Sequence, residues 1–321
     1  YVVTPLTSTF HGLTDDRITD IAEWGDTLVY ASKNGMGLII KDFPGPRFFV
    51  SDGLPSELVH AVHPDGDQVW VATDEGLVVL DKFGFIQNPA NTSFTCYSIA
   101  KTDSALWVGT DTGVAYLRNG TEDWVHTQLE PDPRPVYSLA YDGEKLWAGA
   151  RARFYWYDGS VWAKNDVFDL YGTYALNNRN CELRGLLPMP DGSLFVGGGD
   201  PNSQRRGVHL VHFDGAGKTQ IPFNGIIMNG LLRINFDIDE SLWISTANFG
   251  VAKLKPDGDW FAYNSVTGDT DMTSRFNLTL LADSQGSKWF CTLSYPANPK
   301  PIDELDDGLD TDYENDIWAH Y

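Results

Sequence analysis

The sequence predicts an all-β fold, a seven-bladed β-propeller of four-stranded antiparallel blades. A short apolar phrase, usually with Trp in its second position and a small residue near its end, recurs seven times at intervals of 37 to 48 residues. Self-similarity at such a period indicates a repeat architecture. The 31 Gly, 17 Pro and 13% aromatic residues suit short strands joined by tight turns. The seven copies occupy residues 28–32, 69–73, 106–110, 146–150, 194–198, 242–246 and 288–292.

The second repeat displays the elements of one blade most clearly. An innermost strand is expected at 58–62, followed by a Pro-Asp-Gly-Asp turn, the Trp strand at 69–73, a third strand at 77–81 and a weaker outer strand at 85–87. Four short strands joined by Gly and Asp turns form one antiparallel meander, which is the unit of a propeller blade. Outer strands of other blades are expected at 48–50, 124–126, 162–164 and 260–263. Because the repeat runs from end to end, residues 1–321 are predicted to form a single domain.

The last blade allows two arrangements of the chain ends. Its inner strands are expected at 278–281 and at the Trp289 phrase, followed by an acidic insertion at about 294–315 and a final piece at 316–321. If that piece is the third strand, residues 1–4 supply the fourth, and the ring is closed by the N-terminal strand with no edge left unpaired. Alternatively, the final piece is itself the outer strand. We favour closure by the N-terminal strand.

The net charge of -21 and the pI near 4.5 argue against nucleic-acid partners and anionic membranes, since both require Lys and Arg to neutralise phosphate. No apolar run reaches the length of a membrane-spanning helix, so no direct membrane insertion is expected. Cys96, Cys181 and Cys291 lie in three different repeats without metal-ligand spacing. They are expected to be small buried hydrophobes.

Basic residues concentrate in blades four and five. Residues 134–233 contain 11 Lys or Arg against 9 Asp or Glu, whereas the chain as a whole contains 23 against 44. In a meander, the loops before the innermost strands lie on the same face as the loops between the second and third strands. Seven arginines are therefore expected on one sector of that face: Arg151, Arg153, Arg179, Arg184, Arg205, Arg206 and Arg233.

These arginines are candidate ligands for an anion, because a guanidinium matches carboxylate, sulfate or phosphate in a bidentate manner. Tyr171 and Tyr174, in the loop before blade five, would add a stacking surface for a sugar ring. The alternative is that the arginines pair with neighbouring acids such as Glu182 and Asp200, or are merely solvated.

The acidic insertion is a candidate for calcium binding. Residues 303–316 contain eight acids and no base, and Ca²⁺ takes six to eight oxygen ligands. No other cofactor is expected, and the spacing does not match an EF-hand. A solvated acidic loop is the alternative. The candidate ligands are Asp303, Asp306, Asp307, Asp310 and Asp312.

The blades resemble the two-component regulator propeller repeat. The likeness is carried by Ser-Asp-Gly-Leu-Pro-Ser at 51–56, by Leu-Trp-Val-Gly-Thr-Asp-Thr-Gly-Val at 106–114 and by the weaker opening at 11–16. Blade five departs from it, with Phe195 in place of Trp and Gly198 in place of Ser or Thr. The family includes the extracytoplasmic sensor regions of bacterial hybrid histidine kinases and other secreted or surface propellers. The resemblance therefore implies a bacterial protein that is periplasmic, extracellular or on the cell surface.

Three functions remain open on the sequence. The first is a non-enzymatic module that binds a ligand or protein partner, such as an anionic glycan, on the face that carries the arginines. The second is a structural subunit of a secretion or cell-surface assembly, since similar blades occur in type IX secretion components. The third is a lyase or hydrolase acting at the mouth of the central channel, with His60 and Glu182 as candidate residues. No recognisable catalytic motif supports the third.

Overall fold

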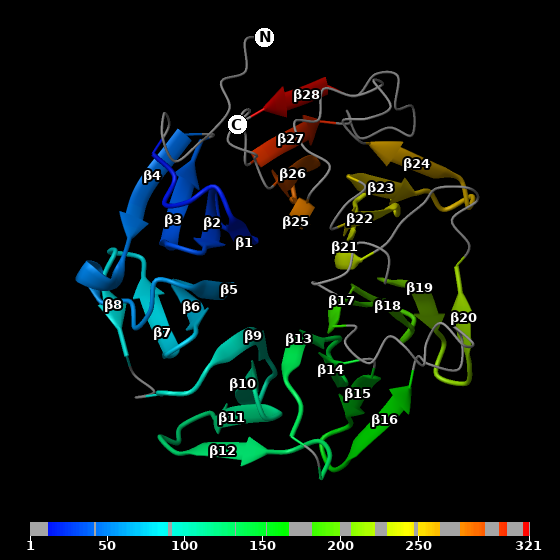
Figure 1. Ribbon diagram of the computed structural model, residues 1–321, viewed down its shortest axis with the longest axis horizontal. Helices are drawn as coiled ribbons and strands as arrows, with labels where there is room; N and C mark the ends of the chain where they lie inside the picture. Colours follow the sequence, from blue (N-terminus) through cyan, green and yellow to red (C-terminus); the bar gives the residue numbers. More distant parts are fainter. Residues whose placement is uncertain are drawn as a thin grey trace.

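The strands form antiparallel sheets that surround a central axis as the blades of a propeller (Figure 1). In the computed structural model, the described residues are 12–41, 43–88, 92–131, 133–151, 153–166, 182–199, 207–221, 230–246, 250–263, 277–292, 302–306 and 317–320. Within these ranges there are seven sheets, each of four strands in chain order. The predicted all-β propeller of four-stranded antiparallel blades is confirmed. We number the sheets as blades one to seven along the chain.

Each blade runs outwards from the axis in chain order. The innermost strands are β1 (Ile18–Trp24), β5 (Val59–Asp65), β9 (Cys96–Lys101), β13 (Val136–Tyr141), β17 (Glu182–Pro188), β21 (Leu231–Phe236) and β25 (Asn277–Ala282). The second strands carry the apolar phrase and are β2 (Thr27–Ser32), β6 (Gln68–Thr73), β10 (Ala105–Thr110), β14 (Leu146–Ala150), β18 (Leu194–Gly199), β22 (Leu242–Thr246) and β26 (Ser287–Thr292).

Two further strands complete the outer half of each blade. The third strands are β3 (Gly35–Ile40), β7 (Gly76–Asp81), β11 (Val114–Arg118), β15 (Arg153–Tyr157), β19 (Gly207–Phe213), β23 (Val251–Leu254) and β27 (Ile302–Asp306). The outermost strands are β4 (Phe43–Phe48), β8 (Ile86–Gln87), β12 (Trp124–Thr127), β16 (Trp162–Asp166), β20 (Lys218–Gln220), β24 (Trp260–Tyr263) and β28 (Ile317–His320). A single 3₁₀ turn among the described residues, η1 (Val50–Asp52), links blades one and two.

The predicted closure by the N-terminal strand was wrong. The acidic segment contains a strand, because β27 pairs with β26 over Ile302–Asp306. This moves the end of the chain one place outwards, and β28 pairs with β27 as the fourth strand of blade seven. The fourth place is therefore filled by the C-terminal piece, as in the alternative arrangement. Strand β27 lies within the acidic insertion that was expected at about 294–315.

The phrase tryptophans pack one blade against the next. Trp107 of blade three lies 5.5 Å from the ring of Tyr157 and 6.0 Å from that of Trp162, both in blade four. Trp147 of blade four is 1% exposed and packs in one cluster with Leu183 and Phe213 of blade five. Aromatic pairs at these separations add to the burial of apolar area. The repeated phrase therefore supplies packing contacts between neighbouring blades.

Several of these indoles also find a polar partner in the turn between the first two strands of their own blade. The indole nitrogen would otherwise be a buried donor without an acceptor, which is costly. The turn aspartates accept its hydrogen at 2.7 Å for Trp147 and Asp142, 2.7 Å for Trp243 and Asp237, and 2.9 Å for Trp289 and Asp283. This explains why Asp recurs in that turn.

Two of the three cysteines are buried in the blades. Cys96 and Cys291 have at most 1% of their surface exposed. Burial raises the pKa of Cys96 to about 12, so this thiol stays protonated and behaves as a small hydrophobe. Cys181 lies outside the described residues.

A buried ion pair links blades six and seven. The Lys288 ammonium lies 2.9 Å from Asp237 Oδ2, and neither side chain is exposed. Asp237 also accepts hydrogen bonds from the Trp243 indole and the Ile238 amide. Desolvation of two charges is costly, so the pair persists only because each charge has its partner in place.

We predict that Lys288→Met destabilises the protein by about 3–5 kcal/mol, because it leaves the Asp237 carboxylate buried without its counter-charge. The free energy of unfolding in urea measures the loss. The double variant Lys288→Met/Asp237→Asn should recover most of it, because no unpaired charge then remains. Wild-type stability in the single variant would show that the pair does not act as described.

Candidate functional site

Each innermost strand contains a β-bulge close to its start. In every blade the pairing with the second strand skips one residue of the innermost strand. A bulge leaves its extra residue out of the ladder and re-aims the side chain. The skipped residues are Thr19, His60, Tyr97, Tyr137, Arg184, Leu232 and Leu278.

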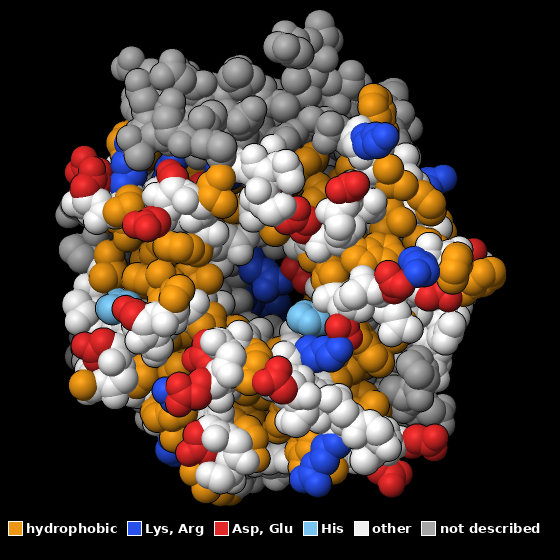
Figure 2. Space-filling view, turned by 180° about the vertical axis from the view of Figure 1, so that it is seen from behind, with side chains coloured by type: hydrophobic (Ala, Val, Ile, Leu, Met, Phe, Trp, Pro, Cys, Tyr) orange, Lys and Arg blue, Asp and Glu red, His pale blue; other side chains and the backbone are white. Residues whose placement is uncertain are grey.

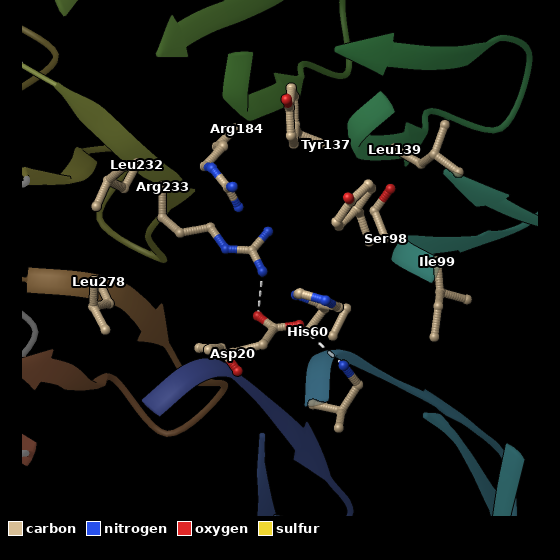
Figure 3. Close-up of a pocket in the computed structure, with 14 residues that line it drawn as sticks. Asp20, His60, Ser98, Ile99, Tyr137, Leu139, Arg184, Leu232, Arg233 and Leu278 are labelled. Atoms are coloured by element: carbon tan, nitrogen blue, oxygen red, sulfur yellow. Dashed lines mark hydrogen bonds and ion pairs between the residues drawn. The ribbon is translucent and has the colours of Figure 1, made fainter. Parts of the chain in front are cut away.

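All seven bulge residues line one cavity on the propeller axis. They come from the same end of seven innermost strands, so the cavity lies at one mouth of the central channel. Its volume is about 70 Å³. Figure 3 shows Arg184 and His60 pointing into this space from two different blades, with Tyr137 beside Arg184 in the wall. We call this cavity the channel-mouth site.

The channel-mouth site has a polar side and an apolar side. The bulges of blades two to five contribute the polar side chains His60, Tyr97, Tyr137 and Arg184. The bulges of blades six and seven contribute the apolar side chains Leu232 and Leu278. Such a division suits a ligand with one polar and one apolar face, because polar groups in a site fix orientation while apolar walls supply burial.

Arg184 is the centre of a polar cluster between blades four and five. Its Nε and Nη2 donate to Glu182 Oε2 at 2.9 and 2.7 Å, and its guanidinium lies 5.0 Å from the centre of the Tyr137 ring. Arg151 Nε donates to the Tyr137 hydroxyl at 3.1 Å. The Arg184 side chain is 41% exposed, so part of its donor set faces the solvent at the mouth.

Tyr137 is held in the neutral form. Burial, followed by the nearby Glu182 carboxylate, raises the pKa of Tyr137 to about 12. The phenol therefore keeps its proton at physiological pH and acts as a hydrogen-bonding group rather than an anion. Its hydroxyl accepts a hydrogen bond from Arg151, which does not itself line the cavity.

His60 forms the opposite part of the polar side. Its Nε2 lies 2.6 Å from Asp74 Oδ1, and its ring meets the Tyr97 ring edge to face at 5.1 Å. Burial lowers the pKa of His60 below its ordinary value of 6.5, although Asp74 acts in the other direction. The imidazole is therefore neutral near pH 7, and the bond to Asp74 places its proton on Nε2.

Arg233 crosses the channel instead of facing a ligand. Its Nη2 pairs with Asp20 of blade one, and its Nε donates to Thr279 Oγ1 of blade seven at 3.3 Å. The other Asp20 oxygen accepts the Val62 amide of blade two at 3.1 Å. Figure 3 shows this bridge beside His60. The bridge connects four blades, so Arg233 serves the channel wall.

Arg153 lies apart from this cluster. It donates to Glu130 Oε2 at 2.5 Å, and Lys164 contacts the other oxygen of the same carboxylate at 3.1 Å. It does not line the channel-mouth site. Among the described arginines predicted to bind an anion, Arg151 and Arg184 are therefore brought together, Arg233 is a neighbour engaged with Asp20, and Arg153 belongs to a separate ion-pair network.

The remaining predicted site residues lie in strand β27 or outside the described part of the chain. Asp303 and Asp306 belong to β27. Among the residues that the structure describes, no group of three or more His, Cys, Asp or Glu is placed to hold a metal ion. The predicted residues outside the described part are Arg179, Arg205, Arg206, Tyr171, Tyr174, Asp307, Asp310 and Asp312.

Sequence reasoning missed the two tyrosines that dominate the site. Tyr97 and Tyr137 read as ordinary members of an alternating strand, and only the register shift takes them out of the ladder. A positional signal does exist. The bulge residue precedes the second residue of the apolar phrase by ten residues in blades one to four and by eleven in blades five to seven. Comparing that column between the repeats would have found the ring.

Comparisons with known proteins support the fold. No family model matches the chain, and no curated protein matches it significantly. The extracellular domain of the putative hybrid two-component system BT3049 from B. thetaiotaomicron is similar in structure, with a TM-score of 0.72, 16% identity and 92% of this chain covered. This chain spans only 41% of that domain.

Two further structures share the architecture over nearly their whole length. A catalytically inactive variant of virginiamycin B lyase from Staphylococcus aureus, solved with quinupristin, has a TM-score of 0.67 and 14% identity, with 91% of this chain and 96% of the lyase covered. The computationally designed Ika8 protein has a TM-score of 0.61 and 12% identity, with 94% and 86% covered. At these identities the likeness concerns the fold alone. Within the described residues, no helix is long and apolar enough to cross a membrane.

We predict that acidification lowers the free energy of unfolding through protonation of His60. A histidine whose pKa is lowered by burial contributes stability that is complete above its ordinary pKa of 6.5, and that contribution falls as the pH drops below this value, because the unfolded state then binds the proton more readily. The free energy of unfolding should decrease between about pH 7.5 and about pH 5. His60→Gln should decrease less over the same interval. An equal decrease in both proteins would contradict the prediction.

Proposed function

We propose that this protein is a non-enzymatic binding module whose ligand presents an anionic group to the channel-mouth site. The observation that carries the proposal is the set of seven bulges, which direct seven side chains into one cavity. A repeat that served packing alone would have no need to fill this column with His, Tyr and Arg. Bulges are frequent beside functional sites because they re-aim a side chain out of the strand ladder.

An anionic ligand group is supported by the donors of Arg184, because the other charged groups that line the cavity, Arg233 and Asp20, pair with each other. The partly exposed Arg184 guanidinium is bonded to one oxygen of Glu182 and retains donors for a second acceptor. Tyr137 and neutral His60 add hydrogen-bonding capacity without adding negative charge. A carboxylate or sulfate would therefore find charge-assisted bonds here.

The size and shape of the site favour an acidic carbohydrate. A volume of about 70 Å³ holds a single functional group, well below the 300–1,000 Å³ that encloses a whole drug-sized ligand. The ligand is therefore anchored by its acidic end, with its remaining part outside the mouth. The Tyr97 ring, which lies 5.5 Å from the Tyr137 ring and lines the cavity, offers an aromatic face of the kind that packs against sugar rings.

A position outside the cytoplasm is part of the proposal. It is supported by the likeness in fold to an extracellular sensor-type domain and by the resemblance of the repeat. In this interpretation the propeller recognises a glycan, or a glycan-bearing partner, at the surface of a bacterial cell. Fractionation of cells that express the native gene would test it, and recovery in the cytoplasm would contradict it.

Binding of acidic disaccharides tests the site directly. We predict that disaccharides containing galacturonate or glucuronate bind the protein, and that their neutral counterparts bind at least about tenfold more weakly, because they lack the charge-assisted bonds. Arg184→Met should reduce the affinity for the acidic compounds by roughly 10- to 100-fold, measured by calorimetric titration.

Arg153→Met is the matched control. It also removes one arginine of blades four and five, but from the Glu130 network outside the cavity. Its affinity for the acidic disaccharides should equal that of the wild type. Equal losses in both variants would show that overall charge, and not the channel-mouth site, governs binding. Unchanged binding in Arg184→Met would overturn the site assignment.

A lyase is a second candidate, favoured by the His60–Asp74 pair. The neutral imidazole carries its proton on Nε2 and therefore a lone pair on Nδ1, as a general base requires. Incubation with the acidic disaccharides, followed by the ultraviolet absorbance of an unsaturated product, separates the two functions. Turnover that His60→Gln abolishes while binding persists would establish the enzyme. Binding without any product supports the module.

A further inference from the structure

An apolar groove lies between blades five and six, at the end of the innermost strands opposite to the channel-mouth site. It begins beside Met189, just after β17, and Phe236, the last residue of β21. Phe195, Leu254 and Trp260 form its body. The groove has a volume of about 420 Å³, which is within the range of small-molecule sites.

Hydrophobic side chains gather around this groove on the molecular surface. Figure 2 shows the face away from the viewer of Figure 1, and orange side chains form a patch at its left, where blades five and six lie. Phe236 is 39% exposed and Ile238, in the adjoining turn, is 53% exposed. Apolar surface of this kind on a soluble protein indicates a binding site when it is contiguous and concave.

The repeat itself explains why the groove exists. At the junction of blades three and four the matching positions are Trp107, Tyr157 and Trp162, whose rings lie 5.2 to 6.0 Å apart. At the junction of blades five and six they are Phe195, Leu254 and Trp260, as the strand registers show. Two large rings are thus replaced by smaller side chains. The space that the aromatic rings fill at the junction of blades three and four is therefore left open at the junction of blades five and six.

The rim of the groove carries a strained glutamate. Glu240 has φ of 65° in the turn between β21 and β22, a left-handed conformation that is strained for a non-glycine residue. Blades five and seven place glycine at the matching position, Gly192 with φ of 82° and Gly286 with φ of 94°. Blade six therefore keeps a carboxylate at a position where blades five and seven, whose turns have the same length, use glycine.

The groove is lined by one acidic side chain, Glu240, and one basic side chain, Lys255. The Glu240 side chain is exposed and makes no ion pair with any residue that the structure describes, whereas the Lys255 ammonium lies over the Phe261 ring at 4.4 Å. The exposed Asp257 lies between Pro256 and Gly258, both of which line the groove, and adds negative charge near it. A cation at this edge would lie near carboxylates and within reach of the Trp260 ring, and both attract positive charge.

We propose that this groove is a second binding site, for a small organic cation with an aromatic or aliphatic body. The body occupies the space left by Phe195 and Leu254 and stacks on Trp260. The cationic nitrogen faces Glu240. This site is separate from the channel-mouth site in position and opposite to it in the charge that it selects.

Three probes of one shape test the proposal: 4-phenylbutylammonium, 4-phenylbutanol and 4-phenylbutyrate. They share the apolar body and differ in charge, so the affinity should fall in that order by roughly three- to tenfold a step. Saturation-transfer NMR detects binding, and titration gives each dissociation constant. Equal affinity for the ammonium and the carboxylate, or no binding of the ammonium, would overturn the proposal.

Two variants locate the binding. Phe195→Trp restores the repeat residue and fills the groove, so it should abolish binding of all three probes; Leu254→Tyr replaces it if the first variant does not fold. Glu240→Gly should leave the affinity for the alcohol unchanged and remove the preference for the ammonium. It should also raise the urea midpoint, because glycine relieves the left-handed strain.

Arg184→Met is the control and should bind the probes as the wild type does. A loss of ammonium binding in this variant, or its survival in a folded Phe195→Trp protein, would place the cation elsewhere. Failure of the acidic disaccharides to bind leaves this test unaffected, since the two sites share no residue.

Discussion

The packing of each phrase tryptophan against the next blade is the constraint on which the rest of the structure depends. It sets the spacing of the blades, for example through the contacts of Trp107 with Tyr157 and Trp162. Sheets held in that arrangement direct the starts of seven innermost strands to one point on the axis. The bulges then turn one side chain from each strand into that point. The channel-mouth site is thus a product of the same geometry that stabilises the fold.

Departures from the repeat mark the places where side chains have another role. In the bulge column, the strand contacts do not require polar residues, yet His60, Tyr97, Tyr137 and Arg184 occupy it. At the junction of blades five and six, Phe195 and Leu254 fail to fill the space that larger rings fill elsewhere. In the first place polar side chains replace apolar ones, and in the second smaller side chains replace larger ones. A cavity is found at both places.

The fold was largely predictable from sequence because each blade repeats a local rule. The phrase 146–150 and its turn aspartate Asp142 specify a strand, a turn and a buried indole with its acceptor within a few residues. The end of blade seven was not predictable in the same way. Strand β27 lies in an acidic segment whose apolar pattern is weak, so its pairing with β26 depends on the blade as a whole.

The candidate site was predictable only in part. Arg184 and Arg151 were expected on this face, and the structure brings them together around Tyr137. Arg153 was expected to join them but begins strand β15 and pairs with Glu130, since the direction of a side chain on a strand depends on register. The site tyrosines were missed because a bulge leaves no composition signal in a single blade.

An experimental structure with a bound acidic disaccharide tests the central claim most directly. We expect the carboxylate to lie within hydrogen-bonding distance of the Arg184 guanidinium at the channel mouth, with the sugar ring against Tyr97. A carboxylate bound at Arg153, or at any place away from the seven bulge residues, would contradict the assignment of the channel-mouth site.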